Sequence, residues 1–252
     1  MIEGLIASVE NKRAELARLR PLKPHALVNL ERAADLEITY TSNAIEGSTL
    51  TQIETNLVIE KGITIGGKAL KDHLEAIDHY EAIGYVRELA RQHAPLTESD
   101  IRNLHALVTR RSAPEIAGRY ATAGRYVNTD AGRHEFPVPA LVPALMGDLA
   151  QWLRAAPQTA ETAFTAHRRL VDIHPFNDGN GRTARLLMNL VLIRGGHPPI
   201  AIRPEDRLAY LRALQGAQSE GCDEEFRRLL YQRLDATLGD YLSAVRKALS
   251  DP

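Results

Sequence analysis

Apolar residues recur at three- and four-residue steps along most of this chain, which is the period of an amphipathic α-helix. Strand signals are scarce, and the β-prone run at residues 125–127 stands among glycines and prolines. We therefore predict an all-α fold with one small β-hairpin. The expected helices cover residues 1–20, 27–46, 70–85, 97–108, 146–153, 159–173, 183–193 and 229–242.

Residues that typically break or cap helices separate these predicted helices. The prolines of residues 21–24 divide the first helix from the second, and the glycines of residues 62–67 mark a turn. Gly195 and Gly196 close the helix that covers residues 183–193. Thr49, with Gln52 three residues later, matches a capping box and predicts that a helix opens there.

Composition narrows the class of protein. The chain has 252 residues, with 31 Lys plus Arg against 32 acidic residues, and no basic stripe is interleaved with aromatics. Neither nucleic acid nor an anionic membrane is therefore an expected partner. The single Cys222 allows no intramolecular disulfide, and no 18-residue apolar run is present. We expect a cytoplasmic protein with one sizeable core.

The densest chemistry lies in residues 174–182, His-Pro-Phe-Asn-Asp-Gly-Asn-Gly-Arg, between two predicted helices. This turn feeds a helix N-terminus, where unpaired backbone N–H groups and the positive end of the dipole favour an anion. Glycines on both sides of Asn180 let the backbone approach a ligand closely. Arg182 and Arg185 lie three apart on one helix face, which is unfavourable unless something negative faces them. The turn therefore predicts a polyphosphate site.

Two side chains of the turn have the chemistry to act on a nucleotide. His174 has an ordinary pKa of about 6.5, so it can accept a proton at neutral pH. Asp178 is a hard oxygen ligand of the kind that holds Mg²⁺ together with substrate phosphates. A purely structural loop explains the glycines and the asparagine, but not these two residues together with the arginines. Attack on a nucleotide phosphate is the expected chemistry.

From His174 to Arg185 the chain resembles, at every position, the signature H-x-F-x-[D/E]-G-N-G-R-x-x-R of the Fic family, also called Fido. The likeness continues from about residue 97 to about residue 230. It implies the Fic/Fido helical fold and transfer of AMP from ATP to a Ser, Thr or Tyr hydroxyl of a protein target, with release of pyrophosphate. The protein itself is one candidate target, and relatives are commonly homodimers.

The resemblance also implies roles for the signature residues. His174 would deprotonate the target hydroxyl, Phe176 would anchor the loop in the core, and Asp178 would hold Mg²⁺. The backbone and side chains of the Gly-Asn-Gly run would cradle the α- and β-phosphates, with Arg182 on the β-phosphate and Arg185 on the γ-phosphate. The expected nucleotide-binding residues of the signature are thus Asp178, Gly179, Asn180, Gly181, Arg182 and Arg185.

A second pattern, Ser-Asn-Ala-Ile-Glu-Gly, occupies residues 42–47. Helical periodicity ahead of it and Gly47 as a C-cap place Glu46 in the last turn of a helix, where a negative charge is unfavourable unless a cation pairs with it. The run resembles the family's inhibitory motif, [S/T]-x-x-x-E-[G/N]. That resemblance implies autoinhibition: Glu46, with Ser42 at the head of the motif, pairs with Arg185 and displaces the γ-phosphate. Some relatives also use this glutamate to remove AMP, which the sequence leaves open.

Residues 117–139 are rich in glycine and proline and predict a hairpin or an irregular loop. By position this segment resembles the family's flap, which clamps the target by strand addition. The expected target-binding residues of the flap are Arg125, Tyr126, Val127 and Asn128. The resemblance places three more residues near the nucleotide base, namely Tyr210, Leu211 and Gln218. His105 and His167 show no metal-ligand spacing, and His197 is expected to shape a turn.

The resemblance divides the chain into an N-terminal helical region with the inhibitory motif (residues 1–95), a catalytic core (96–232) and a C-terminal helix (233–252). Other functions stay open, some within the Fic family and one outside catalysis. A kinase-like branch that transfers the γ-phosphate typically carries a lysine at the position of Gly181, whereas UMP or phosphocholine transfer fits the same turn. A non-catalytic nucleotide-sensing module would bind ATP without needing His174 as a base.

Overall fold

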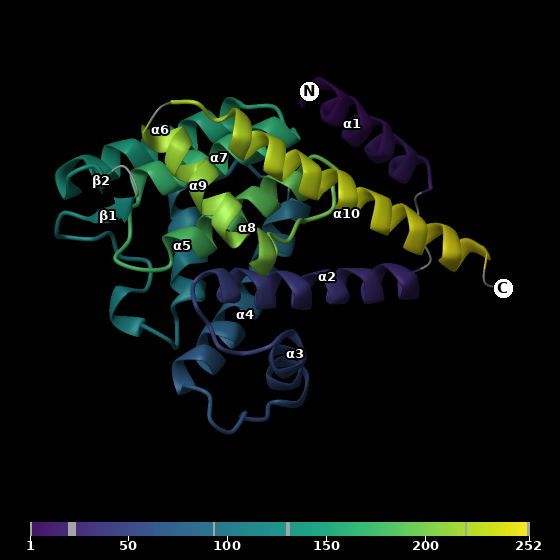
Figure 1. Cartoon of the computed structure of the whole chain (residues 1–252), viewed down its shortest axis with the longest axis horizontal. Coiled ribbons are helices and arrows are strands. Elements are labelled where there is room, and N and C mark those ends of the chain that lie inside the picture. Colours follow the sequence, from purple (N-terminus) through teal and green to yellow (C-terminus); the bar gives the residue numbers. More distant parts are fainter. Residues whose placement is uncertain (1, 20–23, 93, 130–131, 220, 251–252) are drawn as a thin grey trace.

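The computed structural model describes residues 2–19, 24–92, 94–129, 132–219 and 221–250. In these ranges helices dominate and the only sheet is a two-stranded hairpin, which confirms the predicted all-α fold (Figure 1). The helices are α1 (Ile2–Arg18), α2 (Pro24–Ile45), α3 (Gln52–Lys61), α4 (Leu70–Gln92), α5 (Glu98–Val108), α6 (Val142–Ala155), α7 (Ala160–Ile173), α8 (Asn180–Arg194), α9 (Arg207–Ser219) and α10 (Glu224–Ser250). Short 3-10 turns lie at η1 (Pro114–Ile116), η2 (Pro139–Leu141) and η3 (Pro204–Asp206).

Helix α8 lies at the centre of the molecule, in contact with α4, α5 and α7 (Figure 1). Nearly every side chain from Asn180 to Leu192 is buried, the polar and charged ones included. A helix that is covered on all sides reads as apolar almost throughout, which fits the run from Leu186 to Ile193. The residues that lead into α8 are therefore held by the core of the protein.

Helices α1 and α10 pack side by side along one flank (Figure 1). The buried Val9 and Leu16 of α1 face this contact region, and Lys12 Nζ lies 2.8 Å from Asp235 Oδ1 of α10. Helix α10 runs from Glu224 to Ser250 without a break, so the domain boundary expected at residue 232 falls inside a helix. The N- and C-terminal helices are thus one packed unit.

Helix α2 is fixed against α4 by a buried ionic cluster. Arg87 of α4 donates to both carboxylate oxygens of Asp35, with 2.6 Å between Arg87 Nη2 and Asp35 Oδ1, and its Nη1 lies 3.2 Å from Glu31 Oε1. Charge-assisted, multiply bonded pairs of this kind impose a geometry as well as an attraction. The cluster orients α2 so that its C-terminal end reaches α8.

Two helix ends beside the signature turn differ from the sequence prediction. Helix α8 begins at Asn180, three residues early, because Gly179 takes a left-handed conformation with φ 76° and caps it. Helix α2 ends at Ile45, so Glu46 follows the last turn instead of lying in it. The prolines expected to separate α1 from α2 fall partly in residues 20–23, outside the described residues.

The predicted capping box at Thr49 was wrong. The N-cap of α3 is Thr51, whose hydroxyl accepts from the backbone N–H of Glu54 while the Glu54 carboxylate accepts from the backbone N–H of Thr51. Thr49 instead donates from its backbone and its hydroxyl to Asp72 Oδ2, at 2.9 and 2.6 Å. Thr49 therefore binds Asp72 of α4 and does not cap α3, in contrast to the prediction from the local sequence.

The hairpin consists of β1 (Tyr126–Thr129) and β2 (Gly132–Glu135), paired antiparallel with Tyr126 opposite Glu135. It lies at the end of the molecule opposite the C-terminus (Figure 1). Just before it, the backbone N–H of Ala121 donates to Pro175 O at 2.9 Å, which ties the start of this segment to the turn between α7 and α8.

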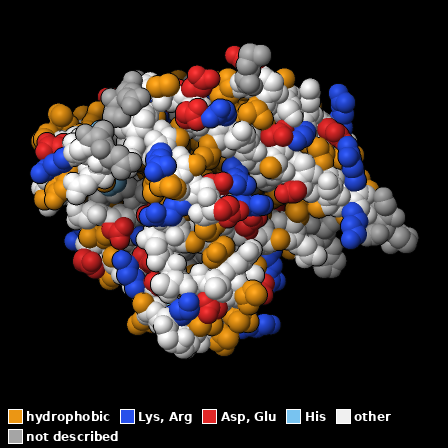
Figure 2. All heavy atoms as spheres, viewed as in Figure 1, with side chains coloured by type: hydrophobic (Ala, Val, Ile, Leu, Met, Phe, Trp, Pro, Cys, Tyr) orange, Lys and Arg blue, Asp and Glu red, His pale blue; other side chains and the backbone are white. Residues whose placement is uncertain are grey.

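The surface carries no broad field of one sign on the face shown in Figure 2, where acidic and basic side chains are interspersed. Among the described residues, no helix combines the length and the apolar character needed to cross a bilayer.

Candidate active site

His174 sits at the junction of α7 and the following turn. It closes α7 in the left-handed region, with φ 48°, and its backbone N–H donates to Leu170 O at 3.0 Å. Its ring stacks on Phe136, with 3.9 Å between ring centroids and 12° between planes. Burial, and then the nearby charge of Arg125, lower the pKa of His174 to about 4. The imidazole is therefore neutral at neutral pH and able to accept a proton.

The turn after His174 is braced from inside. Phe176 is completely buried and stacks on His105 at 3.6 Å between centroids. The side chain of Asn180 bonds both backbone groups of Phe176, at 2.9 Å from N to Oδ1 and 2.8 Å from Nδ2 to O. His105 Nδ1 accepts from the backbone of Gly118, so its Nε2 donates to Asp178 O at 2.9 Å. These contacts fix the backbone before any ligand arrives.

The side chain of Asn180 thus braces the turn, and its contact with the phosphates stays a prediction. Both ends of that amide are used on Phe176, and the residue is buried. The backbone N–H groups of the first turn of α8 have no partner within their own helix. They, with Gly179 and Gly181, form the anion-attracting end of α8.

Glu46 reaches into this end of α8 from α2. Its Oε1 accepts from Arg185 Nη2 at 2.7 Å, while Arg185 Nε donates to Ser42 Oγ at 2.9 Å and Nη2 donates to Ser42 O at 3.0 Å. Burial is the largest single effect and acts to lower the pKa of Arg185, but the charge and hydrogen bond of Glu46, together with Tyr210, more than offset it, and the pKa is raised. The guanidinium is buried and stays charged, and Ser42 and Glu46 together hold it.

Gly181 shows how closely the Glu46 carboxylate approaches the helix end. A Cβ atom at this position would clash with Glu46 Oε1 and lie 3.0 Å from Arg185 Nη1. The carboxylate thus occupies the space that a glycine opens beside the first turn of α8. An acidic group in this position satisfies the same N-terminal dipole that would attract a phosphate.

Arg182 and Asp178 complete the charged groups of the turn. Arg182 is only 2% exposed, and its Nη2 lies 3.4 Å from Asp178 Oδ1. Burial acts to raise the pKa of Asp178, but Arg182, the backbone N–H of Gly179 and Lys71 more than offset it, and the pKa is lowered. The Asp178 side chain, 49% exposed, is therefore an ionised carboxylate open to a cation.

Comparisons with known proteins match this geometry to one family. A sequence profile of the Fic/DOC family matches residues 95–192. The crystal structure of a Fic domain containing signaling protein from Bacteroides thetaiotaomicron superposes with a TM-score of 0.87, at 32% identity over 95% of this chain and 97% of that one. The chain belongs to the Fic/DOC family. Fic-1 (aa134 - 508) from C. elegans also superposes with a TM-score of 0.87, at 31% identity over 98% of this chain and 73% of that one.

Curated Fic relatives are longer than this chain. Protein adenylyltransferase Fic from Nematostella vectensis is 34% identical over 250 residues, which cover 96% of this chain and 56% of that protein. The chain spans about half the length of the curated relatives it matches. What those relatives do as whole proteins therefore comes to this chain only as a proposal.

The other residues predicted for this Fic-family site lie in two places. Arg125, just before β1, and Val127 of β1 are half-buried, whereas Tyr126 and Asn128 of β1 are exposed. Arg125 is close enough to His174 to lower its pKa. Tyr210 is buried in the core, where its hydroxyl bonds His167 Nε2 at 2.8 Å. Leu211 and Gln218 lie along α9, half-buried. Contact of these three residues with a nucleotide base stays a prediction.

Several residues of the Fic-family site were missed from the sequence. Lys71 and Glu75 of α4 lie beside Asp178 and Arg182, and Phe136 stacks on His174. His105, which has no metal-ligand spacing in the sequence, orders the signature turn. No local motif marks these residues. The available signal was the four-residue spacing of Lys71 and Glu75, which puts both on one helix face.

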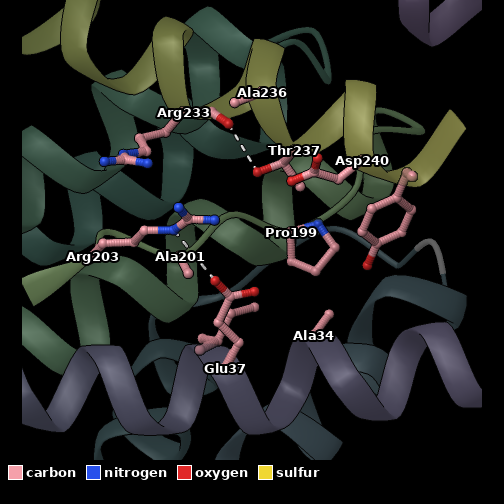
Figure 3. A pocket seen from close by; sticks show the side chains of 11 residues that line it. Ala34, Glu37, Pro199, Ala201, Arg203, Arg233, Ala236, Thr237 and Asp240 are labelled. Atoms are coloured by element: carbon pink, nitrogen blue, oxygen red, sulfur yellow. Dashed lines mark hydrogen bonds and ion pairs between the residues drawn. The ribbon is translucent and has the colours of Figure 1, made fainter. Parts of the chain in front are cut away.

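A separate cavity of about 70 Å³ lies between α2, residues 199–203 and α10 (Figure 3). Its two arginines are already paired: Arg203 Nε lies 3.6 Å from Glu37 Oε1, and Arg233 pairs with Asp206. The cavity shares no residue with the signature turn. It is therefore a feature distinct from the proposed nucleotide site.

Proposed function

We propose that this Fic-family protein is a protein adenylyltransferase that moves AMP from ATP to a Ser, Thr or Tyr hydroxyl of a protein target. The observation that carries the proposal is the convergence of a neutral His174, an ionised Asp178 and two buried arginines at one helix N-terminus. Curated relatives at 32–34% identity that are named protein adenylyltransferases support it.

The chemistry follows from these positions. The target oxygen attacks the α-phosphorus of ATP, the bond from that phosphorus to the bridging oxygen of the β-phosphate breaks, and pyrophosphate leaves. His174 takes the proton of the hydroxyl, as a general base with a pKa well below neutrality can. The α8 N-terminus and Arg182 would bind the α- and β-phosphates, and Arg185 would bind the γ-phosphate when Glu46 is displaced.

Mg²⁺ fits the site as a partner of the substrate. Asp178 offers one ionised, half-exposed carboxylate, and among the described residues no group of three His, Cys, Asp or Glu could form a metal cage. Mg²⁺ is commonly held by one or two carboxylates together with substrate phosphates. Bound there, it would neutralise the charge that develops on the pyrophosphate.

We infer that the resting protein is autoinhibited by Glu46. The carboxylate bonds the arginine assigned to the γ-phosphate and fills the space beside Gly181. The triphosphate tail and Glu46 therefore compete for one guanidinium. Gly181, at the position where the kinase-like branch typically carries a lysine, favours AMP transfer over that branch.

The target would bind along the hairpin. In a two-stranded sheet each strand keeps one unpaired edge, which can accept an extended peptide by strand addition. Half-buried Arg125 and Val127 and exposed Tyr126 and Asn128 would lie beside that peptide. The peptide hydroxyl would then come near His174, because Phe136, next to β2, stacks on its ring.

The decisive experiment is intact-mass spectrometry after incubation with ATP and Mg²⁺. We expect an AMP-sized increment on Glu46→Gly, on the protein itself or on a protein in a lysate, at a rate at least tenfold above the wild type. His174→Ala in the same background should abolish it. A phosphate-sized increment would indicate the kinase-like reaction, and nucleotide binding without any adduct would indicate a sensor.

Two further proposals concern the setting of the protein. A homodimer is supported by exposed apolar side chains around α3 and the start of α4, with Ile53 74% and Leu70 67% exposed. A cytoplasmic location is supported by the single thiol, Cys222, which is free and exposed.

A further inference from the structure

The contact between Arg182 and helix α4 has no part in the function proposed above. Arg182 Nη1 lies 2.9 Å from Glu75 Oε1, and both side chains are buried. Taking an arginine out of water is strongly unfavourable unless an acid neutralises it. Asp178 is half-exposed and 3.4 Å away, so Glu75 supplies the closer and more deeply buried counter-charge.

This pairing leaves hydrogen-bond donors of Arg182 available. Its Nε and Nη1 are buried, and within the described ranges neither has a hydrogen-bond acceptor. The closeness of Nη1 to Glu75 is therefore an electrostatic contact without the alignment of a hydrogen bond. A buried donor without an acceptor is costly, so such donors in a native protein point to an absent ligand.

Glu75 belongs to a row of residues on one face of α4. Lys71, Glu75 and His79 follow at four-residue steps, and Lys71 Nζ lies 3.6 Å from Glu75 Oε1 and 3.8 Å from Asp178 Oδ2. Burial, and then the charges of Arg185 and Arg182, hold the pKa of His79 well below its ordinary value, so that ring stays neutral. The row therefore presents one buried negative charge to the arginines of α8.

We propose that Glu75 is a positioning residue for nucleotide binding. Glu75 keeps Arg182 buried and directed along α8. The Nε and Nη1 donors of Arg182 then stay available to bind the β-phosphate. The ligand class is a nucleoside diphosphate or triphosphate, since a monophosphate has no phosphate at that place. The inference rests on the proposed function, because it takes the phosphates to lie at the N-terminus of α8.

The test compares ADP with AMP by isothermal titration calorimetry in the presence of Mg²⁺. ADP has no γ-phosphate, so the Glu46–Arg185 pair does not have to open. We expect Glu75→Gln to weaken ADP binding about tenfold and to leave AMP binding unchanged, the size of coupling within one charged network. Because the contact is electrostatic, glutamine should fail to replace glutamate although it keeps the shape, whereas Glu75→Asp should recover part of the ADP affinity.

Two controls make the result specific. Glu88→Gln removes another acid from α4, one that is exposed and more than three turns away, and should leave both affinities unchanged. Adding Glu75→Gln to Arg182→Gln should cause no further loss of ADP affinity, because the arginine that Glu75 positions is already gone.

An unchanged ratio of ADP to AMP affinity in Glu75→Gln would overturn the inference. Tighter ADP binding would also overturn it, since Glu75 would then compete with the phosphate for Arg182. If Glu75→Gln is too unstable to titrate, the ratio of ADP to AMP affinity is measured for Glu75→Asp instead. A selective loss of ADP affinity would support the inference, and an unchanged ratio would overturn it. Failure of the wild type to bind either nucleotide would instead refute the proposed function.

Discussion

Single residues of this site owe their charge state to burial and to the partner buried beside them. His174, His105 and Arg185 are each shielded from water, and each keeps the form its role requires: neutral for the two imidazoles, charged for the guanidinium paired with Glu46. Sequence motifs name the residue types but not these states. The protonation of His174 is the property most directly open to measurement.

We expect the acid limb of the pH–rate profile to lie well below the ordinary imidazole range. His174 must be deprotonated to act as a base, and burial lowers its pKa to about 4, so kcat/KM of Glu46→Gly should stay nearly constant from pH 7.5 down to about 6. The measurement is the rate of adduct formation across that range at saturating Mg²⁺. An inflection between pH 6 and 7 would mean that the base is solvated, or is another group.

At the scale of elements, helix ends decide what the site contains. Gly179 starts α8 inside the signature, which puts Gly181, Arg182 and Arg185 on the first turns. The end of α2 at Ile45 leaves Glu46 free to cross to Arg185. Amphipathic periodicity located both helices, and tertiary contacts shifted their ends by a few residues, as at α3.

The cap of α3 gives a prediction at this scale. Thr51→Ala should lower the free energy of unfolding by about 1 kcal/mol, because it removes the side chain that accepts from Glu54 N. Gln52→Ala, which the local pattern marks as part of the box, should change it by no more than a few tenths. Urea denaturation of both variants checks the pair. Equal losses would show that Thr51 is not the functional cap.

At the scale of the whole molecule, buried histidines make stability depend on pH, and His105, His167 and His197 add to the effect of His79 and His174. Burial lowers the pKa of His105 and His197 to about 4 and that of His167 to about 3. Their unfolded pKa is about 6.5, so between these values the unfolded chain binds more protons than the folded one. Stability is therefore complete above pH 6.5 and falls as the pH drops through this window.

We expect the free energy of unfolding at pH 5.5 to be lower than at pH 7.5 by about 1 kcal/mol for each of these histidines. Denaturant titration at the two pH values measures it. The loss should shrink in His197→Gln, whose side chain lies away from the signature turn and pairs only loosely, at 3.8 Å, with Glu10. A stability that rises on acidification would contradict the reasoning.

The assembly of the molecule can be tested through Leu70. If the exposed side chains around α3 form a homodimer interface, Leu70→Asp should give a monomer by light scattering at a concentration where the wild type is dimeric. Lys61→Asp, which changes a charge at the last residue of α3 without removing an apolar side chain, is the control and should leave the oligomeric state unchanged. A monomeric wild type at high concentration would remove the homodimer proposal.

The sequence by itself determined the helical class, the hairpin and the chemistry of the signature turn. Period and turn residues are local properties, and the spacing of His174, Asp178, Arg182 and Arg185 survives any arrangement of the other helices. It also pointed to Glu46, through a motif and an unfavourable charge at a helix end.

Only the tertiary structure decided which distant side chains complete the site. Glu75 meets Arg182, Phe136 meets His174 and His105 holds Asp178 because helices and a hairpin far apart in sequence pack around α8. The structure also turned the side chain of Asn180 inward and moved a helix cap from Thr49 to Thr51. Pairing, burial and the resulting charge states are non-local, so no window of the sequence contains them.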